Sequence, residues 1–357
     1  MRVYSRPMNI GILLPNWIGD VVMATPALRA LREHYGSDAR LTGVMRPYVA
    51  EVLAGTDWLD ETLTLNTRAR PRWLNLWRHS RVLKQRRFDQ LLLMTNSFST
   101  GLLSWLGGAR ERVGFAAHGR GWLLTKKLYV PKQAGKAIPR SAIDHYLELA
   151  AAVGATTDNI QTELVATPLE LAAADNVWQE FALHRANRVV VLNTGGAYGA
   201  AKSWPAEHFA LLAKRIVRKY DAAVLVICGP AEKAAAQEIV RLADDKRVVS
   251  IAHKPASLRL SKGCLAKADL VVSTDSGPRH IAAALGVPTI SLFGPTDPRW
   301  SSNYHPLAID LQEQVPCGPC AQRTCPLKHH RCMVDLSVDR VFAAVEQQWQ
   351  LQLERAA

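Results

Sequence analysis

A short polar segment, Pro-Asn-Trp-Ile-Gly-Asp at positions 15–20, follows the apolar run 10–14 and opens a helix. In open α/β sheets, ligands bind in the crevice outside the carboxyl ends of the strands. Gly19 lets the backbone approach a ligand closely, and Asp20 lies near the helix N-terminus. A carboxylate at this place either caps the helix or takes a proton from an attacking hydroxyl. The segment alone leaves both interpretations open.

A second segment, Asn-Thr-Gly-Gly at 193–196, also follows an apolar run, and Lys202 comes just before a helix that Pro205 starts. Small residues and a lysine ahead of a helix N-terminus are typical of a phosphate cradle. The Gly-Lys-Ser/Thr ending of a P-loop is missing. In isolation such a loop is more often an ordinary structural turn than a ligand site.

The most specific segment is Thr-Asp-Ser-Gly-Pro-Arg-His at 274–280, between an apolar strand and a helix of small residues. The amides of Ser276 and Gly277 can hold a diphosphate at the helix start, and Asp275 can hydrogen-bond a sugar. His280 alone would usually be structural, but a similar loop at 294–298 follows the next strand and favours a ligand site. As a site residue, Asp275 should be replaceable by alanine at a cost within about 1 kcal/mol of stability.

Four cysteines are clustered near the end of the chain, in the pattern Cys317-x2-Cys320-x4-Cys325-x6-Cys332 with His329 and His330 between the last two. The arrangement suggests a metal knuckle, although its spacing departs from the common zinc patterns. The sequence leaves open whether these residues bind a structural metal.

Segment 68–87 carries eight arginines or lysines interleaved with Trp73, Trp77 and several leucines. Such a pattern predicts either a solvated helix with a core-facing apolar stripe or a basic helix that contacts an acceptor or an anionic membrane surface.

The elements that position these segments alternate between apolar runs and helical periodicity, which is typical of parallel sheets with crossover helices. In the first half, strands are predicted at 10–14, 41–45, 61–65 and 90–95, and the first helix should end near Tyr35, where Gly36 stops it. The second half restarts the pattern, with strands at 189–193, 223–228, 248–251, 270–274 and 289–293. A length of 357 residues fits two such domains, which join near 167–174.

Composition narrows the class of protein. Hydrophobic residues make up 48% of the chain and charged residues 21%, as in globular proteins, and no apolar run is long enough to span a bilayer. The start has no small-residue cleavage site before Pro15, so we expect a cytoplasmic protein. The net charge of +13 favours an anionic partner.

Two other classes lack their signatures. A nucleic-acid-binding protein should show a recognised reading motif among its basic residues, and none is present, so no nucleic-acid partner is expected. A Rossmann oxidoreductase should carry GxGxxG after the first strand, where this chain has Asn-Trp-Ile-Gly-Asp.

Taken together and in this order along the chain, the three segments resemble glycosyltransferase family 9, the heptosyltransferases. The opening Leu-Pro-Asn-Trp-Ile-Gly-Asp at 14–20, followed by Thr-Pro-Ala-Leu at 25–28, is most similar to the heptosyltransferase II branch. The first-heptose branch has Lys-Thr-Ser before its Gly-Asp, so the resemblance favours addition of the second heptose. Another GT-B sugar-nucleotide transferase, or type I or III acceptor specificity, is the alternative.

The resemblance implies a GT-B fold, an α/β architecture of two facing Rossmann-like domains with parallel sheets. Residues 1–168 would bind the acceptor and 169–357 would bind ADP-heptose, and the last helix can pack back on the first domain. Asp20 matches the proposed catalytic base, with Asn16 and Gly19 in the acceptor loop. Seven residues match nucleotide-sugar positions of the family: Thr194, Lys202, Glu232, Asp275, Ser276, Gly277 and His280.

The family's chemistry is inverting transfer of L-glycero-D-manno-heptose from ADP-heptose to the heptose/Kdo inner core of lipopolysaccharide. The implied partners are the ADP-heptose donor, a lipid A–Kdo–heptose acceptor and the anionic inner face of the inner membrane, where the protein would be peripheral. The resemblance implies no cofactor and no catalytic metal.

Overall fold

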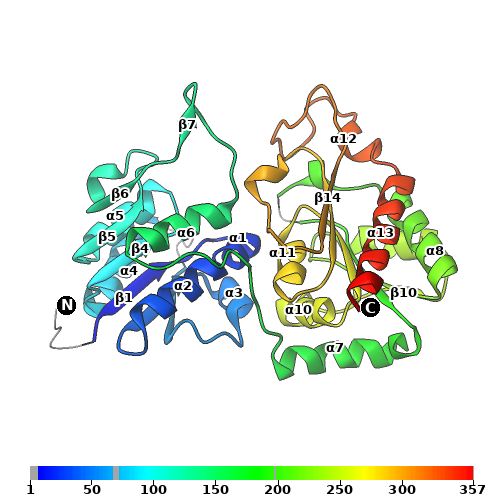
Figure 1. Cartoon of the computed structure of the whole chain (residues 1–357), viewed down its shortest axis with the longest axis horizontal. Coiled ribbons are helices and arrows are strands. Elements are labelled where there is room, and N and C mark those ends of the chain that lie inside the picture. The colour runs from blue at the N-terminus through cyan, green and yellow to red at the C-terminus, as the bar shows by residue number, and fades with distance from the viewer. Residues whose placement is uncertain (1–6, 67–71, 197, 357) are drawn as a thin grey trace. The chain divides into compact units, whose positions relative to one another are not determined.

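The computed structural model describes residues 7–66, 72–196 and 198–356, and it divides the chain into two compact units. The first unit comprises Met1–Leu164 with Arg299–Ser302, and the second comprises Val165–Pro298 with Asn303–Ala357. Each unit is built around one six-stranded parallel sheet (Figure 1). The predicted α/β class with two parallel sheets is confirmed.

The first sheet has the strand order β3-β2-β1-β4-β5-β6. Its strands are β1 (Asn9–Leu13), β2 (Arg40–Met45), β3 (Glu61–Thr64), β4 (Gln90–Leu93), β5 (Glu111–Phe115) and β6 (Lys126–Leu128). Helices α2 (Thr25–Tyr35) and α6 (Ala142–Ala152) pack together, as do α4 (Arg72–Arg86) and α5 (Phe98–Leu106). The shorter elements are α1 (Ile18–Met23), α3 (Pro47–Ala50), the 3-10 turns η1 (Glu51–Leu53) and η2 (Gly121–Leu123), and the hairpin of β7 (Lys132–Gln133) and β8 (Lys136–Ala137).

The first predicted helix is divided in two at Ala24, which ends α1 and begins α2. Pro26 has no amide hydrogen and cannot bond to the carbonyl of Val22. The Thr25 hydroxyl donates to that carbonyl instead, at 2.8 Å. The predicted stop at Gly36 is confirmed, with a φ of 64° that suits glycine.

The second sheet has the order β11-β10-β9-β12-β13-β14. Its strands are β9 (Val189–Asn193), β10 (Ala223–Ile227), β11 (Val248–Ser250), β12 (Leu270–Thr274), β13 (Thr289–Phe293) and β14 (Ala308–Gln312). Its helices are α7 (Pro168–Glu180), α8 (Ala206–Tyr220), α9 (Lys233–Ala243), α10 (Leu258–Ala266), α11 (Gly277–Ala284), α12 (Arg331–Val334) and α13 (Val338–Ala356), and its 3-10 turns are η3 (Leu183–Arg185), η4 (Ala200–Lys202) and η5 (Pro298–Trp300). Strands β9, β10, β12 and β13 are buried along their whole length, because helices cover both faces of such a sheet.

The last helix, α13, packs against α8 within the second unit. Val341, Val345 and Trp349 are buried in the same core cluster as residues of α8 and β9. The aromatic rings of Tyr220 and Trp349 meet edge to face at 4.0 Å. The apolar face of α13 is therefore buried within the second domain.

Strand order reverses between β1 and β4 in the first sheet and between β9 and β12 in the second. Loops at such a switch point diverge to opposite sides of the sheet and leave a crevice for a ligand. All three polar segments found in the sequence follow one of these strands. In the part of the chain that the structure describes, no helix is both long and apolar enough to cross a membrane.

Candidate active site

Asp20 is the third residue of α1, and the N-cap position belongs to Trp17, whose backbone is extended. The interpretation of Asp20 as a helix cap is therefore wrong. The half-buried side chain of Asp20 lies in the first turn of α1. The loop before it is held by Tyr48, whose hydroxyl donates to the backbone carbonyl of Asn16.

Tyr146, on α6, is a neighbour of Asp20 that the sequence analysis missed. Burial and the nearby charge of Asp20 raise the pKa of the Tyr146 phenol well above its usual value. The phenol therefore stays protonated at neutral pH. No sequence signal joins these two residues, because they are far apart along the chain and only the packing of α1 on α6 brings them together.

In the second unit, Asn193 connects the loops that follow β9 and β12. Its side-chain amide donates to the Ser276 hydroxyl at 2.8 Å, to the Ser273 hydroxyl at 3.0 Å and to the Gly195 carbonyl at 3.0 Å. Because Asn193 is buried at the end of β9, these bonds fix the position of Ser276 at the start of α11.

The two glycines after β9 allow their neighbours to approach closely. A Cβ at Gly195 would lie 2.8 Å from Cγ of Glu232, and a Cβ at Gly196 would lie 2.6 Å from Cβ of Ser276. Only a residue without a side chain fits at either contact. The structure thus brings the Thr194 loop, Glu232 and Ser276 together, although they come from three different segments.

Asp275 lies at the centre of a buried ion network. The Lys202 ammonium donates to one carboxylate oxygen at 2.5 Å, and the same oxygen accepts from the Thr296 hydroxyl at 2.7 Å. Arg279 donates to the other oxygen through Nε at 3.1 Å and pairs with it through Nη2 at 3.0 Å. All three charged residues are buried, with 9%, 6% and 0% exposure for Lys202, Asp275 and Arg279.

This network fixes the charge of Asp275. Burial alone would raise the pKa of its carboxyl, but the positive charges of Arg279 and Lys202 more than offset burial and hold the pKa far below the usual value. The carboxylate therefore has structural partners within the protein, which the sequence analysis did not anticipate. The expected stability cost of about 1 kcal/mol for its removal is revised in the Discussion. Arg279 and Thr296 were missed as partners, although Arg279 stands four residues after Asp275, a spacing that joins side chains on a helix.

His280 is buried in the first turn of α11, and burial followed by the charge of Arg279 lowers its pKa well below the usual value. Its imidazole is therefore neutral. His280 Nδ1, Thr194 Oγ1 and Thr274 Oγ1 are buried polar atoms without a hydrogen-bond partner among the described residues. Buried polar groups are normally paired, so a polar ligand bound at the loops after β9 and β12 would give these three atoms partners.

The start of α11 adds backbone donors to this place. Ser276 occupies the N-cap position, and no side chain caps the helix there, because the Ser276 hydroxyl donates back to the Thr274 carbonyl at 3.2 Å. The amides that begin at Gly277 are suited to an anion. The structure thus gathers the predicted donor-site residues around the carboxyl ends of β9, β10 and β12, whereas Asp20, Asn16 and Gly19 lie in the first unit.

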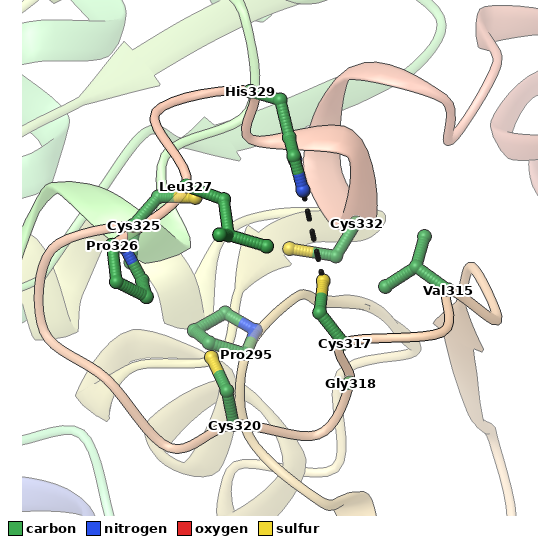
Figure 2. A pocket seen from close by; sticks show the side chains of 11 residues that line it. Pro295, Val315, Cys317, Gly318, Cys320, Cys325, Pro326, Leu327, His329 and Cys332 are labelled. Carbon is green, nitrogen blue, oxygen red and sulfur yellow. Dashed lines mark hydrogen bonds between the residues drawn. The ribbon is translucent and has the colours of Figure 1, made fainter.

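A second cluster lies in the same unit, in the segment between β14 and α12 and the first turn of α12. Figure 2 shows four cysteines and His329 around one small cavity. Backbone groups of Leu327 to His330, His330 first, lower the pKa of the Cys325 thiol. Burial raises the pKa of the Cys332 thiol, and the other three cysteines raise it further, so all four thiols lie within electrostatic range of one another.

Comparisons with known proteins agree with this geometry. Residues 76–331 match the profile of glycosyltransferase family 9 (heptosyltransferase). Lipooligosaccharide heptosyltransferase 2 of Campylobacter jejuni serotype O:2 is 27% identical over 347 residues, 94% of this chain and 96% of that protein. Lipopolysaccharide heptosyltransferase 2 of Escherichia coli K12 is 24% identical over 351 residues, 94% of this chain and 97% of that protein.

Among solved structures, E. coli ADP-heptose lipopolysaccharide heptosyltransferase II superposes with a TM-score of 0.78 at 21% identity, covering 97% of this chain and all of that one. The likeness confirms a fold of the GT-B type. With most of its length matching the family profile, the chain belongs to glycosyltransferase family 9, the heptosyltransferases.

Proposed function

We propose that the protein transfers L-glycero-D-manno-heptose from ADP-heptose to the inner core of lipopolysaccharide, and that it adds the second heptose. The observation that carries the proposal is the buried Lys202–Asp275 ion pair next to the uncapped start of α11, together with the buried polar atoms of Thr194, Thr274 and His280 that lack partners among the described residues. The relatives named above bear the name heptosyltransferase 2, which supports this choice of acceptor.

In this proposal, residues 169–357 bind the donor and residues 1–168 bind the acceptor. The diphosphate would accept hydrogen bonds from the first amides of α11 and from Lys202, and Thr194 and His280 would supply further polar contacts. Glu232 would meet the nucleoside. Asp275 would contact the donor sugar, and it would also hold Lys202 in place, since their contact is direct and buried.

The reaction would be a direct displacement that inverts the anomeric carbon. Asp20 takes the proton from an acceptor heptose hydroxyl as its oxygen attacks that carbon, and ADP leaves from the opposite face. Donors that are already oriented at the diphosphate stabilise the charge that develops on it, and this is among the largest contributions to catalysis in such sites. Transfer of heptose to an acceptor that already carries one heptose is the experiment that tests this function.

We also propose that the first domain contacts the anionic inner face of the membrane, where a lipid-anchored acceptor would be found. On α4, Leu83 faces the core, whereas Trp73 is 72% exposed and Arg81 lies over the ring of Trp77 at 3.5 Å. Both features predicted for this segment, a core-facing apolar stripe and an exposed basic face with aromatic rings, are therefore present on α4. Exposed aromatic rings with arginines suit an anionic lipid interface.

Charge reversal of this face should weaken membrane binding. In Arg78→Glu/Arg81→Glu, binding to vesicles that contain phosphatidylglycerol should fall at least several-fold at low salt, because each basic residue near such a surface contributes about 1 kcal/mol. The difference should shrink as salt rises. The matched control is Arg241→Glu/Lys246→Glu, which changes the same charge on exposed residues of the second domain. If both variants bound vesicles equally well, α4 would be an ordinary solvated surface helix without a role in membrane binding.

A further inference from the structure

The segment between β14 and α12 has neither helix nor strand over residues 313–330 and contains three of the six cysteines, and a fourth, Cys332, follows in α12. All four thiols are free, so no disulfide holds this segment in shape. A cavity of about 30 Å³ lies in this part of the chain (Figure 2). It is lined by Cys317, Cys320, Cys325, Cys332 and His329, together with Val315, Pro326 and Leu327. The cavity is about the size of one water molecule or one ion.

The donors around this cavity suit a soft or borderline metal. Thiols and an imidazole are the ligands that Zn²⁺ prefers, and no carboxylate is among the residues that line the cavity. Cys317 Sγ and His329 Nε2 are 3.9 Å apart. Two ligands of one tetrahedral Zn²⁺, with bonds of about 2.3 Å to sulfur and about 2.0 Å to nitrogen, are roughly 3.5 Å apart. This spacing is close to that of a shared metal, and binding through Nε2 would require His329 to give up the hydrogen bond that its Nδ1 accepts from the Arg331 amide at 3.0 Å.

Cys332 is the next candidate ligand, since Figure 2 shows its sulfur beside the line that joins Cys317 to His329. Cys320 extends toward the same space from the opposite side. Cys325 differs, because in the view of Figure 2 the side chain of Leu327 stands between its sulfur and that line. Among the described residues no three of these side chains stand in metal-binding geometry, so metal binding would require side chains of this group to move.

The same segment packs against the loops of the candidate active site. The amide of Ala201 donates to the Arg323 carbonyl at 3.1 Å, and the amide of Ala321 donates to the Pro295 carbonyl at 2.7 Å. A Cβ at Gly199 would lie only 2.3 Å from the Arg323 carbonyl oxygen. The segment therefore supports both the loop that carries Lys202 and the loop that carries Thr296, the two partners of one Asp275 oxygen.

We propose that Cys317, Cys320, Cys332 and His329 bind one thiophilic divalent cation of the Zn²⁺ class, and that this ion fastens segment 313–330 against the active-site loops. Cys325 shapes the turn that presents His329 and is not a ligand. The ion has a structural role and takes no part in the transfer chemistry. Closed four-ligand sites of thiolates and imidazole are the usual form of structural zinc.

Titration of the reduced, metal-free protein with Co²⁺ tests the proposal without any activity measurement, so its outcome is independent of the proposed function. We expect the near-ultraviolet absorption of cobalt–thiolate bonds and the visible bands of a tetrahedral site, saturating at about one equivalent and abolished by Zn²⁺. Zn²⁺ should also slow cleavage by trypsin at Arg323 and Lys328 at least several-fold, because binding orders the segment. Absence of the thiolate absorption in the wild-type protein at excess Co²⁺ would overturn the proposal.

Matched variants test the ligand set. Cys317→Ser, Cys332→Ser and His329→Ala should weaken Co²⁺ binding at least tenfold, in line with the loss of one ligand of four. Two controls should keep the wild-type spectrum: Cys325→Ser in the same segment, and Cys264→Ala, whose thiol is buried in α10. Wild-type cobalt binding in Cys317→Ser or Cys332→Ser would contradict the assignment, as would loss of binding in Cys325→Ser.

Discussion

Replacement of Asp20 by asparagine is expected to lower turnover by roughly 100-fold or more, the usual scale for loss of a general base. Asparagine has nearly the same size as aspartate, so the first turn of α1 and its contacts should persist. It cannot accept a proton from the acceptor hydroxyl. Turnover is to be measured at saturating ADP-heptose and acceptor, with donor affinity measured separately by calorimetry.

The control for this prediction is Tyr146→Phe, which removes the protonated phenol beside Asp20 and leaves the carboxylate in place. It should reduce turnover far less than Asp20→Asn does. Asp20→Asn should bind ADP-heptose like the wild-type protein, because the proposed donor residues all lie in the other domain. Near-wild-type turnover of Asp20→Asn would remove Asp20 from the mechanism.

The second large effect is expected at Asp275. Asp275→Ala leaves the buried charges of Arg279 and Lys202 without their common partner, and breaking a buried ion pair in this way costs roughly 3 to 5 kcal/mol. This replaces the figure of about 1 kcal/mol expected from the sequence. Denaturant unfolding should show the loss, whereas Asp310→Ala, an exposed aspartate on β14, should stay within about 0.5 kcal/mol of wild type.

The contribution of Asp275 to stability should depend on pH, and the direction follows from the lowered pKa of its carboxyl. The folded-state pKa of Asp275 lies below its unfolded value of 3.8, so its stabilisation is fully present above that pH and is lost as the pH falls below it. The stability difference between wild type and Asp275→Ala should therefore be constant near neutral pH and shrink in acid. A constant difference down to strong acid would contradict the buried ion network.

The variant Lys202→Ala separates the contribution of the ion network to stability from its proposed contribution to binding of the donor diphosphate. It leaves Asp275 paired with Arg279, so it should destabilise the fold less than Asp275→Ala does. It should nevertheless weaken ADP-heptose binding much more than acceptor binding, because the proposed contact is between its charge and the diphosphate. Unchanged donor affinity in calorimetry would refute that contact.

Much of the fold follows from local patterns. Strands that are buried on both faces, such as β9 and β12, were predicted from the sequence. Helices cover both faces of a parallel sheet, so its central strands appear as nearly continuous apolar runs. Strands β5, β6 and β14 were missed. They are short or only partly buried, as in the half-exposed β14, so they lack the continuous apolar signal of central strands.

The site was predictable in its loops but not in its side-chain contacts. Polar residues at strand ends indicated where a ligand would bind, since parallel strands present their carboxyl ends along one edge. The partners of these residues depend on packing between segments far apart in the chain. Thr296 reaches Asp275 across adjacent strands, and Tyr146 reaches Asp20 through helix packing. Local periodicity contains no information on either contact.

The central claim is tested most directly by incubating the purified protein with ADP-heptose and lipid A–Kdo acceptors that carry zero, one or two heptoses, and by measuring the mass of the products. We expect a product heavier by one heptose from the one-heptose acceptor alone. Transfer to the acceptor without heptose, or no transfer from ADP-heptose to any of the three, would contradict it.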